Sequence, residues 1–216
     1  MRLYLDSADA ADLARVLPSP LVVGVTTNPT LMRRAGLGWA DLPGFLRRVE
    51  QLGAKTVHVQ VRHADADGML RDAEEYRRAA GDLDLVVKLP ATRDGYAAAA
   101  ALAADGVGVT VTAVVEAEQV LWAALAGARY AAPYLGRMDE GGRDGLAVVR
   151  AMQEVANAYG GGRLRLLVAS IRSPDAFRDL MSLGVGAATV PVALFERLTK
   201  HDATLAAERA FLADAG

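Results

Sequence analysis

Short apolar segments alternate with longer amphipathic segments along the whole of the 216-residue chain. The apolar segments are rich in valine, leucine and alanine, and charged residues, glycine or proline bound them, as is typical of short buried strands. The alternation predicts eight strands, at residues 2–6, 21–26, 56–61, 85–90, 107–112, 128–134, 165–170 and 187–191.

The segments between the predicted strands carry signals for the starts and ends of helices. Ser7 and Thr92 each precede an alanine-rich stretch, where a hydroxyl side chain can cap a helix. Pro174 stands at the first position of another predicted helix, and Gly106 and Gly184 follow helices as C′ residues. Helices therefore alternate with the strands.

Apolar strands that alternate with helices predict a parallel sheet buried on both faces. The strands recur roughly every 26 residues, which suits an α/β fold of the (β/α)8 TIM-barrel type. A doubly wound open sheet is the alternative, but a glycine-rich dinucleotide turn is missing after the first strand. We expect a single TIM-barrel domain over residues 1–216, whose additional C-terminal helix at 201–216 covers a barrel end or packs on a neighbouring subunit.

Composition narrows the possible functions. The net charge is −2 with both signs interspersed, so no basic surface for nucleic acid or for a membrane is expected. The chain has no cysteine, which excludes disulfides, thiolate metal sites and cysteine nucleophiles. Its three histidines are scattered and suggest no metal site, and no apolar segment has the length of a membrane span. We expect a cytoplasmic protein.

Polar residues follow the predicted strands at the ends where TIM barrels carry their chemistry. Each has an ordinary structural explanation: a turn for Thr27 and Asn28, caps for Thr112 and Ser170, a surface ion pair for Arg137 with Asp139. Their convergence on one barrel end nevertheless favours a catalytic site. The candidates are Asp6, Thr27, Asn28, Gln60, Lys88, Thr112, Tyr134, Arg137, Ser170 and Arg172.

Lys88 is the candidate that folding explains least, because it lies inside the apolar segment "LVVKLP". Burial favours the neutral amine, which attacks ketones to form a Schiff base. Such chemistry also needs groups that move protons and position water, and these are Asp6, Tyr134, Thr112 and Gln60. Arg137, Ser170 and Arg172 follow the later strands, near which barrels often bind phosphate.

These residues, in this order, resemble the transaldolase family, most closely its short branch of fructose-6-phosphate aldolases and small transaldolases. The resemblance covers essentially the whole chain, and the ordered set of motifs is more specific than any one of them. The motifs are "LYLDSAD", "GVTTNPTL", "VHVQV", "VVKLPAT", "GVTVTAV", "YAAPYLGRMDEGG" and "LLVASIRSP".

The resemblance implies a role for each candidate. Lys88 would form the Schiff base, Asp6 would transfer protons, and Gln60, Thr112 and Tyr134 would position the catalytic water. Asn28 would hold substrate hydroxyls, and Arg137, Ser170 and Arg172 would bind phosphate. The family implies transfer of a dihydroxyacetone unit between sugar phosphates and aldehydes in pentose and hexose phosphate metabolism, without metal or organic cofactor, by a homo-oligomer that is a pentamer or decamer.

Two positions favour the aldolase branch. Full transaldolases resemble one another in having glutamate where this chain has Gln60 and phenylalanine where it has Tyr134, whereas the aldolase branch has glutamine and tyrosine. Gly136, in contrast, resembles the transaldolase loop, so transaldolase remains the alternative. By strand parity His58 points into the barrel, where we interpret it as a core histidine. Two alternatives of other classes are a non-catalytic sugar-phosphate-binding barrel and an isomerase that uses only acid–base chemistry.

Overall fold

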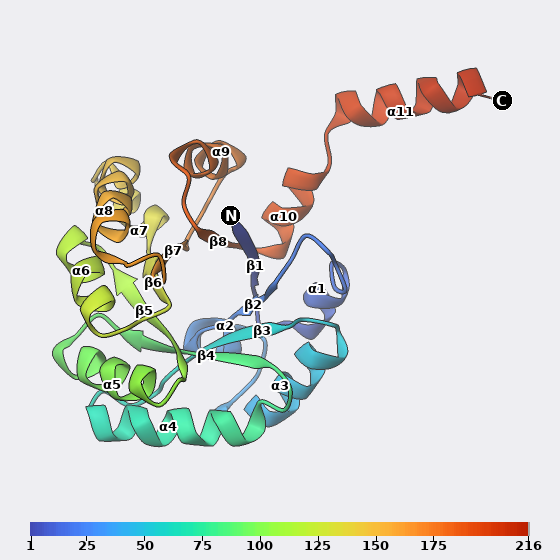
Figure 1. The fold of residues 1–216 in the computed structure, drawn as a ribbon. Helices are drawn as coiled ribbons and strands as arrows, with labels where there is room; N and C mark the ends of the chain where they lie inside the picture. Colours follow the sequence, from blue (N-terminus) through green and yellow to red (C-terminus); the bar gives the residue numbers. More distant parts are fainter. Residues whose placement is uncertain (216) are drawn as a thin grey trace.

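The computed structural model describes residues 1–215, in which eight parallel strands close into a barrel (Figure 1). The strands pair in sequence order, and β1 completes the ring by pairing with β8. They are β1 (Arg2–Asp6), β2 (Gly24–Thr26), β3 (Thr56–Gln60), β4 (Asp84–Pro90), β5 (Gly108–Val114), β6 (Tyr130–Pro133), β7 (Arg165–Val168) and β8 (Ala187–Val190). The predicted TIM barrel is confirmed.

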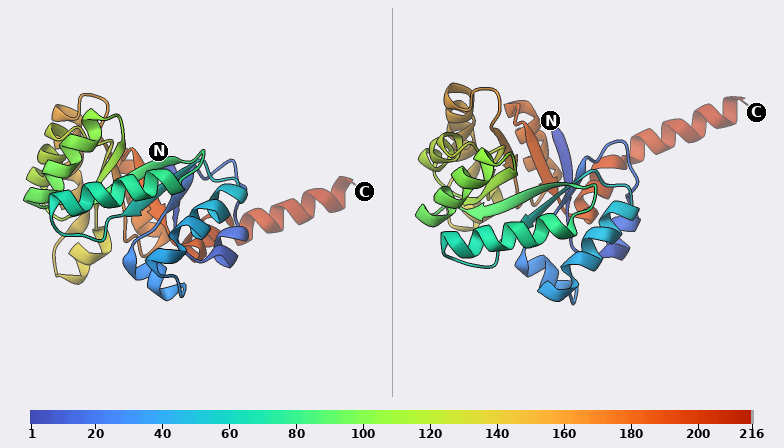
Figure 2. Two further views of the ribbon diagram at one scale, coloured as in Figure 1. Left: turned by 90° about the horizontal axis from the view of Figure 1, so that it is seen from below. Right: turned by 60° about the horizontal axis from the view of Figure 1, so that its bottom comes forward.

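Helices surround the barrel, as Figures 1 and 2 show. They are α1 (Ala10–Ala14), α2 (Pro29–Arg34), the short 3₁₀ helix η1 (Trp39–Asp41), α3 (Leu42–Gln51), α4 (Ala66–Ala79), α5 (Arg93–Ala104), α6 (Ala117–Leu125), α7 (Leu135–Glu140), α8 (Gly145–Tyr159), α9 (Pro174–Leu183), α10 (Val192–Thr199) and α11 (Asp202–Ala215). Among the described residues, no helix combines the length and apolar character that a bilayer crossing requires.

The C-terminal helix α11 extends away from the rest of the molecule (Figures 1 and 2). All of its residues are exposed, including Leu205, Phe211 and Leu212. It therefore covers neither end of its own barrel, and its packing on a neighbouring subunit stays a prediction.

Several predicted boundaries hold because the local side chains specify them. The Thr92 side chain accepts a hydrogen bond from the Gly95 amide and caps α5, and Pro174 begins α9. Gly106 and Gly184 follow their helices with φ angles of 75° and 76°, which glycine adopts without strain.

Other boundaries differ from the prediction. Ser7 does not cap α1, because Asp9 does so by accepting hydrogen bonds from Ala11 and Asp12. The second strand is shorter than predicted and begins at Gly24, where a Cβ would lie 1.9 Å from the Thr56 carbonyl oxygen. That close approach of two backbones explains the glycine.

The barrel has two separate apolar cores. The larger core lies between the outward faces of the strands and the surrounding helices, where alternate strand residues such as Val87 and Leu89 are fully buried. The smaller core lies inside the barrel and consists of Tyr4, Val86, Tyr130, Ala132, Leu167 and Ala187. Side chains that follow the inner core along the strands therefore reach the carboxyl-terminal mouth.

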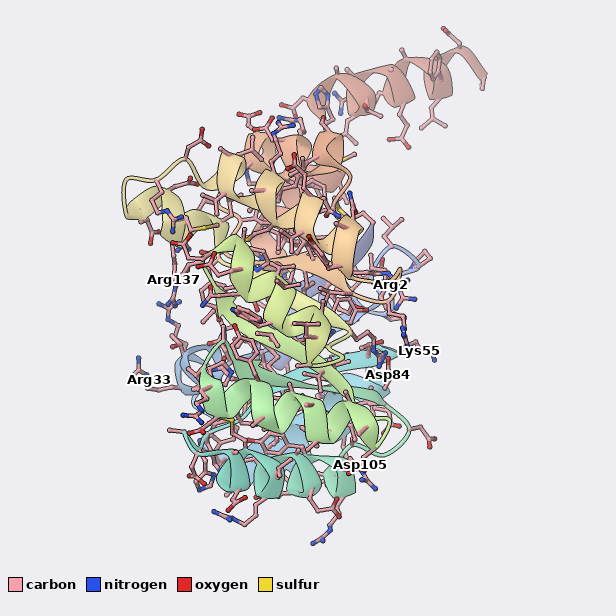
Figure 3. The ribbon with its side chains drawn as sticks, turned by 60° about the vertical axis from the view of Figure 1, so that its left-hand side comes forward. Arg2, Arg33, Lys55, Asp84, Asp105 and Arg137 are labelled. Atoms are coloured by element: carbon pink, nitrogen blue, oxygen red, sulfur yellow. The ribbon has the colours of Figure 1, made fainter. Side chains whose placement is uncertain are left out.

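The two ends of the barrel are distinguished in Figure 3, in which Arg137 lies at one end and Arg2, Lys55 and Asp84 lie at the other. At the amino-terminal end, the Arg2 guanidinium donates to the Tyr130 hydroxyl over 3.2 Å, and Arg129 makes two 2.7 Å bonds to Asp84. These contacts link strands at the amino-terminal end, and the candidate residues lie toward the other end.

Candidate active site at the carboxyl-terminal mouth

Lys88 lies inside the barrel on β4, one inward position nearer the mouth than Val86 of the inner core. Its residue is 5% exposed, and its Nζ donates a 2.9 Å hydrogen bond to the Thr27 carbonyl oxygen. Among residues 1–215, no carboxylate forms an ion pair with Lys88. A buried amine held only by a neutral acceptor is well suited to nucleophilic chemistry.

Asp6 ends β1 at the same mouth. Its Oδ1 accepts a 2.7 Å hydrogen bond from the Thr26 hydroxyl, and the Thr26 hydroxyl lies 2.7 Å from that of Thr189 on β8. Both threonines are buried, with 0% and 2% exposure. The carboxylate is thus oriented by neighbours from β2 and β8.

Tyr134 and Thr112 lie in direct contact, with 3.0 Å between their hydroxyl oxygens. Thr112 is on β5 just before an irregularity in its pairing with β6, and Ala113 at this point has a φ of 59°. Gln60 ends β3 and is the register partner of Lys88. The structure therefore brings the predicted water-positioning residues to the same end of the barrel as the lysine.

Strained backbone marks this mouth. Among residues 1–215, the only non-glycine residues with positive φ are Ala113 (59°), near the carboxyl end of β5, and Ser170 (61°), which follows β7. Such conformations cost free energy and persist where the surrounding structure enforces them, often at functional sites.

The candidate phosphate residues come from two adjacent loops. The Gly136 amide donates to the Ser170 carbonyl oxygen over 3.0 Å, and a Cβ at Gly136 would lie 2.4 Å from that oxygen. Only glycine permits this approach, which holds the start of α7 against the loop after β7. Arg137 lies over the Tyr134 ring, with 4.9 Å from Cζ to the ring centroid. Arg172 instead pairs with Glu140 over 2.9 Å at the surface.

Thr27 and Asn28, predicted to bind substrate, also make contacts within the protein. The Thr27 hydroxyl is buried without a partner among the described residues, while its carbonyl accepts the Lys88 bond. The Asn28 side-chain oxygen accepts from the Leu31 amide and caps α2, which leaves its NH₂ group to donate elsewhere.

His58 lies fully buried inside the barrel, between the rings of Tyr4 (centroids 4.8 Å apart) and Tyr130 (5.1 Å). Its Nδ1 is 2.9 Å from the Thr110 hydroxyl, and its Nε2 has no partner among the described residues. Burial, followed by the positive charges of Lys88 and Arg129, holds the pKa of His58 well below its ordinary value. The core interpretation holds, with only one of the two ring nitrogens satisfied.

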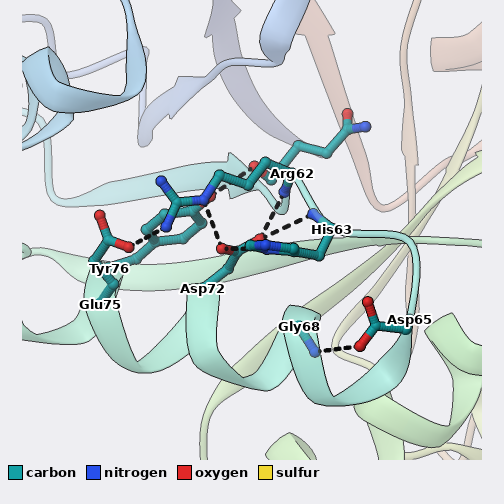
Figure 4. Close-up of polar contacts among 8 residues, drawn as sticks. Arg62, His63, Asp65, Gly68, Asp72, Glu75 and Tyr76 are labelled. Atoms are coloured by element: carbon teal, nitrogen blue, oxygen red, sulfur yellow. Dashed lines mark hydrogen bonds and ion pairs between the residues drawn. The ribbon is translucent and has the colours of Figure 1, made fainter.

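A buried carboxylate that the sequence did not indicate braces the loop after Gln60 (Figure 4). Asp72 of α4 accepts from the backbone and side-chain nitrogens of both Arg62 and His63, over 2.8–3.1 Å. Burial raises the pKa of Asp72, but these hydrogen bonds outweigh it, and the net pKa is lowered. The Arg62 guanidinium also contacts Glu75 and lies over Trp39, 5.8 Å from the ring centroid.

The closed parallel barrel has at its mouth a buried lysine with no ion pair in the described part of the chain, close to groups that can carry protons. These features define a class, that of TIM-barrel enzymes acting at the carboxyl ends of their strands. Comparison with known proteins gives the family. A sequence model described as Transaldolase/Fructose-6-phosphate aldolase matches residues 3–215, and the chain belongs to this family.

Relatives over the full length bear similar names. A "Probable transaldolase" of Anaeromyxobacter sp. (strain K) is 36% identical over 214 residues, covering 99% of this chain and 96% of the relative. One of Methanococcus vannielii is 33% identical (99% and 97% covered), and one of Hyphomonas neptunium is 34% identical (100% and 97% covered). The protein is an enzyme of the aldolase or aldehyde/ketone-transferase type.

Proposed function

We propose that the protein is a lysine Schiff-base aldolase that moves a dihydroxyacetone unit between a ketose phosphate, such as fructose 6-phosphate, and an aldehyde. The observation that carries the proposal is Lys88, which is buried at the mouth, beside Gln60, and whose amine bonds, within residues 1–215, only to a backbone carbonyl. A structural lysine in this position would be expected to have a carboxylate partner.

In the proposed reaction, the Lys88 amine attacks the C2 carbonyl of the ketose and water leaves, which gives an iminium. The C4 hydroxyl proton passes to Asp6 as the C3–C4 bond breaks, and its electron pair neutralises the iminium as an enamine. The phosphorylated aldehyde departs. The enamine then adds to an acceptor aldehyde, or is protonated at carbon and hydrolysed to free dihydroxyacetone.

The remaining candidates receive supporting roles. Thr112 and Tyr134, whose hydroxyls are in contact, would position the water together with Gln60. Asn28 retains an NH₂ group that can donate to substrate hydroxyls, and Thr27 contributes the carbonyl that holds the amine. Arg137, Ser170 and Arg172 would bind the phosphate, since guanidinium groups match its oxygens.

We favour the fructose-6-phosphate aldolase reaction over transfer between sugars because Tyr134 carries an ionisable hydroxyl at the site. A phenol can exchange a proton with the bound three-carbon unit and so allow its release, whereas a phenylalanine cannot. Transaldolase is the second candidate, favoured by the names of the relatives. The phenol contact with Thr112 and the glycine approach at Gly136 are compatible with both.

We further propose that α11 packs on a neighbouring subunit of a homo-oligomer. All of its described residues are exposed in the single chain, and Phe211 and Leu212 are 71% and 69% exposed. An isolated helix of this length is marginal in water, so a partner surface would stabilise it. Light scattering of the intact chain and of a variant ending at Lys200 tests this, because the truncation should reduce the oligomer size.

The deciding experiment measures glyceraldehyde 3-phosphate release from fructose 6-phosphate, with and without an aldose-phosphate acceptor. Release without acceptor identifies an aldolase, and release only with acceptor identifies a transaldolase. Borohydride reduction during turnover should add the mass of the reduced three-carbon unit to Lys88. Lys88→Met, with an unchanged circular dichroism spectrum, is the control and should lose both signals. A wild-type chain that binds substrate without adduct or release would instead be the non-catalytic barrel.

A further inference from the structure

Two buried threonines beside Asp6 have no role in the chemistry proposed above. Thr26 was predicted only as the last residue of a strand, and Thr189 lies on β8, distant in sequence from both Asp6 and Thr26. The backbone pairing of β1 with β2 and β8 already joins these three strands. Valine, which has the same shape as threonine, would fill both positions without burying a hydroxyl. The hydroxyls therefore call for an explanation beyond packing.

The direction of the two hydrogen bonds follows from the chemistry of the groups. An ionised carboxylate only accepts, so the 2.7 Å bond between Thr26 and Asp6 Oδ1 uses the single hydroxyl proton of Thr26. Thr26 then has no proton left for Thr189, although their oxygens are 2.7 Å apart. Thr189 must be the donor. The chain of hydrogen bonds therefore runs from Thr189 to Thr26 to Asp6, and each bond polarises the next.

We propose that Thr189, acting through Thr26, is a positioning residue that commits Asp6 Oδ1 to a hydrogen bond and leaves Oδ2 to exchange the substrate proton. Among residues 1–215, the bonds to the Asp6 side chain involve Oδ1 alone. If Asp6 took up its proton at Oδ1, both hydroxyls would have to reverse inside the barrel. Protonation at Oδ2 leaves the chain intact and keeps the carboxyl group in one orientation through the cycle. This inference rests on the acid–base role of Asp6 in the proposed function.

The test compares Thr189→Val, Thr26→Val, their combination and the rescue variant Thr189→Ser. Thr26→Val removes a charge-assisted bond and should lower kcat on the order of tenfold, while Thr189→Val, which acts one bond further away, should lower it about fivefold. The KM for fructose 6-phosphate should change little. The acidic limb of the pH–rate profile should move to higher pH in both, because the carboxylate loses stabilisation. Thr189→Ser should restore kcat and the profile.

Non-additive losses of kcat would distinguish this chain of hydrogen bonds from two independent packing effects. Because Thr189 reaches Asp6 only through Thr26, the double variant should be no slower than Thr26→Val. Thr56→Val is the matched control, since Thr56 is also a buried threonine (4% exposed) that donates to a carboxylate, that of Asp84, at the opposite end of the barrel. Its pH–rate profile should be that of the wild type.

Borohydride trapping distinguishes the possible failures. If Thr189→Val still gives the Lys88 adduct but retains the wild-type kcat and pH–rate profile, the hydroxyl chain is overturned and the proposed function stands. Additive losses in the double variant, or an equal loss in Thr56→Val, would likewise overturn it. If the wild-type chain gives neither adduct nor turnover with a ketose phosphate, the proposed function fails, and this inference fails with it.

Discussion

Replacing His58 should remove a pH dependence of stability that originates inside the barrel. His58 is 0% exposed, and its neighbours are the rings of Tyr4 and Tyr130, the hydroxyl of Thr110 and the apolar inner core. Burial, with the nearby cations of Lys88 and Arg129, lowers its pKa well below 6.5 in the folded chain. In the unfolded chain the imidazole titrates at its ordinary pKa of about 6.5.

The sign and size follow from proton linkage. Below about pH 6.5 the unfolded state binds a proton that the folded state does not, so the free energy of unfolding falls as pH falls. The loss approaches about 1.4 kcal/mol for each pH unit between the ordinary pKa and the lowered pKa of the folded state. Above the ordinary pKa both states are neutral and His58 contributes no slope. The lowered pKa of Asp72 stabilises the folded state throughout this window. That stabilisation is lost only at lower pH, around and below the ordinary value of 3.8, so Asp72 adds no slope here.

Urea unfolding followed by circular dichroism, at one protein concentration and between pH 5 and pH 7.5, measures the slope. His58→Gln and His58→Phe should both have flatter stability–pH curves than the wild type, by a slope that rises toward about 1.4 kcal/mol per pH unit as the pH falls below 6.5, whatever their absolute stabilities. His201→Gln, at an exposed position, controls for removal of a histidine. Equal slopes in the wild type and both His58 variants would refute a neutral, buried imidazole.

Three further substitutions test the mouth and its support. Tyr134→Phe should depress release of free dihydroxyacetone more than transfer between sugars, and equal losses in the two assays would count against a special role for the phenol. Arg137→Ala should raise the KM for fructose 6-phosphate about tenfold or more but leave that for unphosphorylated dihydroxyacetone nearly unchanged, which steady-state kinetics will measure. Asp72→Asn should lower the free energy of unfolding by about 2 kcal/mol at pH 7, and a chevron or urea titration indistinguishable from wild type would contradict the brace on Arg62 and His63.

The strand order and barrel closure could be predicted because each strand is encoded locally, by a short apolar run with its own boundaries. Two differences from the prediction fall where a contact distant in sequence decides the boundary, and a third, at Ser7, is local. Gly24 begins β2 because the backbone of Thr56 lies against it, and the irregularity at Ala113 depends on the pairing of β5 with β6. Ser7 was a plausible cap, but Asp9 lies closer to the first helical turn and makes the bonds.

In the candidate site, too, some residues could be recognised from the local sequence and others only from contacts made by the fold. Lys88 could be recognised because a charge within an apolar strand is unusual in any sequence. Asp6 became a candidate only together with the other polar residues at the strand ends. Thr189 and Asp72 could not be recognised, because threonine is common in strands and aspartate is common on helices. Their significance comes from the partner that the fold brings to them. The alternation of side chains along β8 places Thr189 on the inward face, two residues before Pro191. Its position beside Asp6 and Thr26 follows only once the pairing of β8 with β1 is known.

The two-core construction explains how the barrel tolerates so many polar groups along its axis. Stability depends on apolar burial, and most of that burial occurs in the outer core between the strands and the helices. The inner core needs only six residues, so the remaining inward positions can carry hydroxyls, an imidazole and an amine. Paired tyrosines lie toward the amino-terminal end, where the Tyr4 and Tyr130 oxygens are 2.9 Å apart, and the lysine and carboxylate lie toward the mouth. The inward-facing side chains pack inside the barrel and not against the helices. Substitutions among them can therefore change the reaction with little effect on the outer core, which a barrel needs if it is to host different reactions.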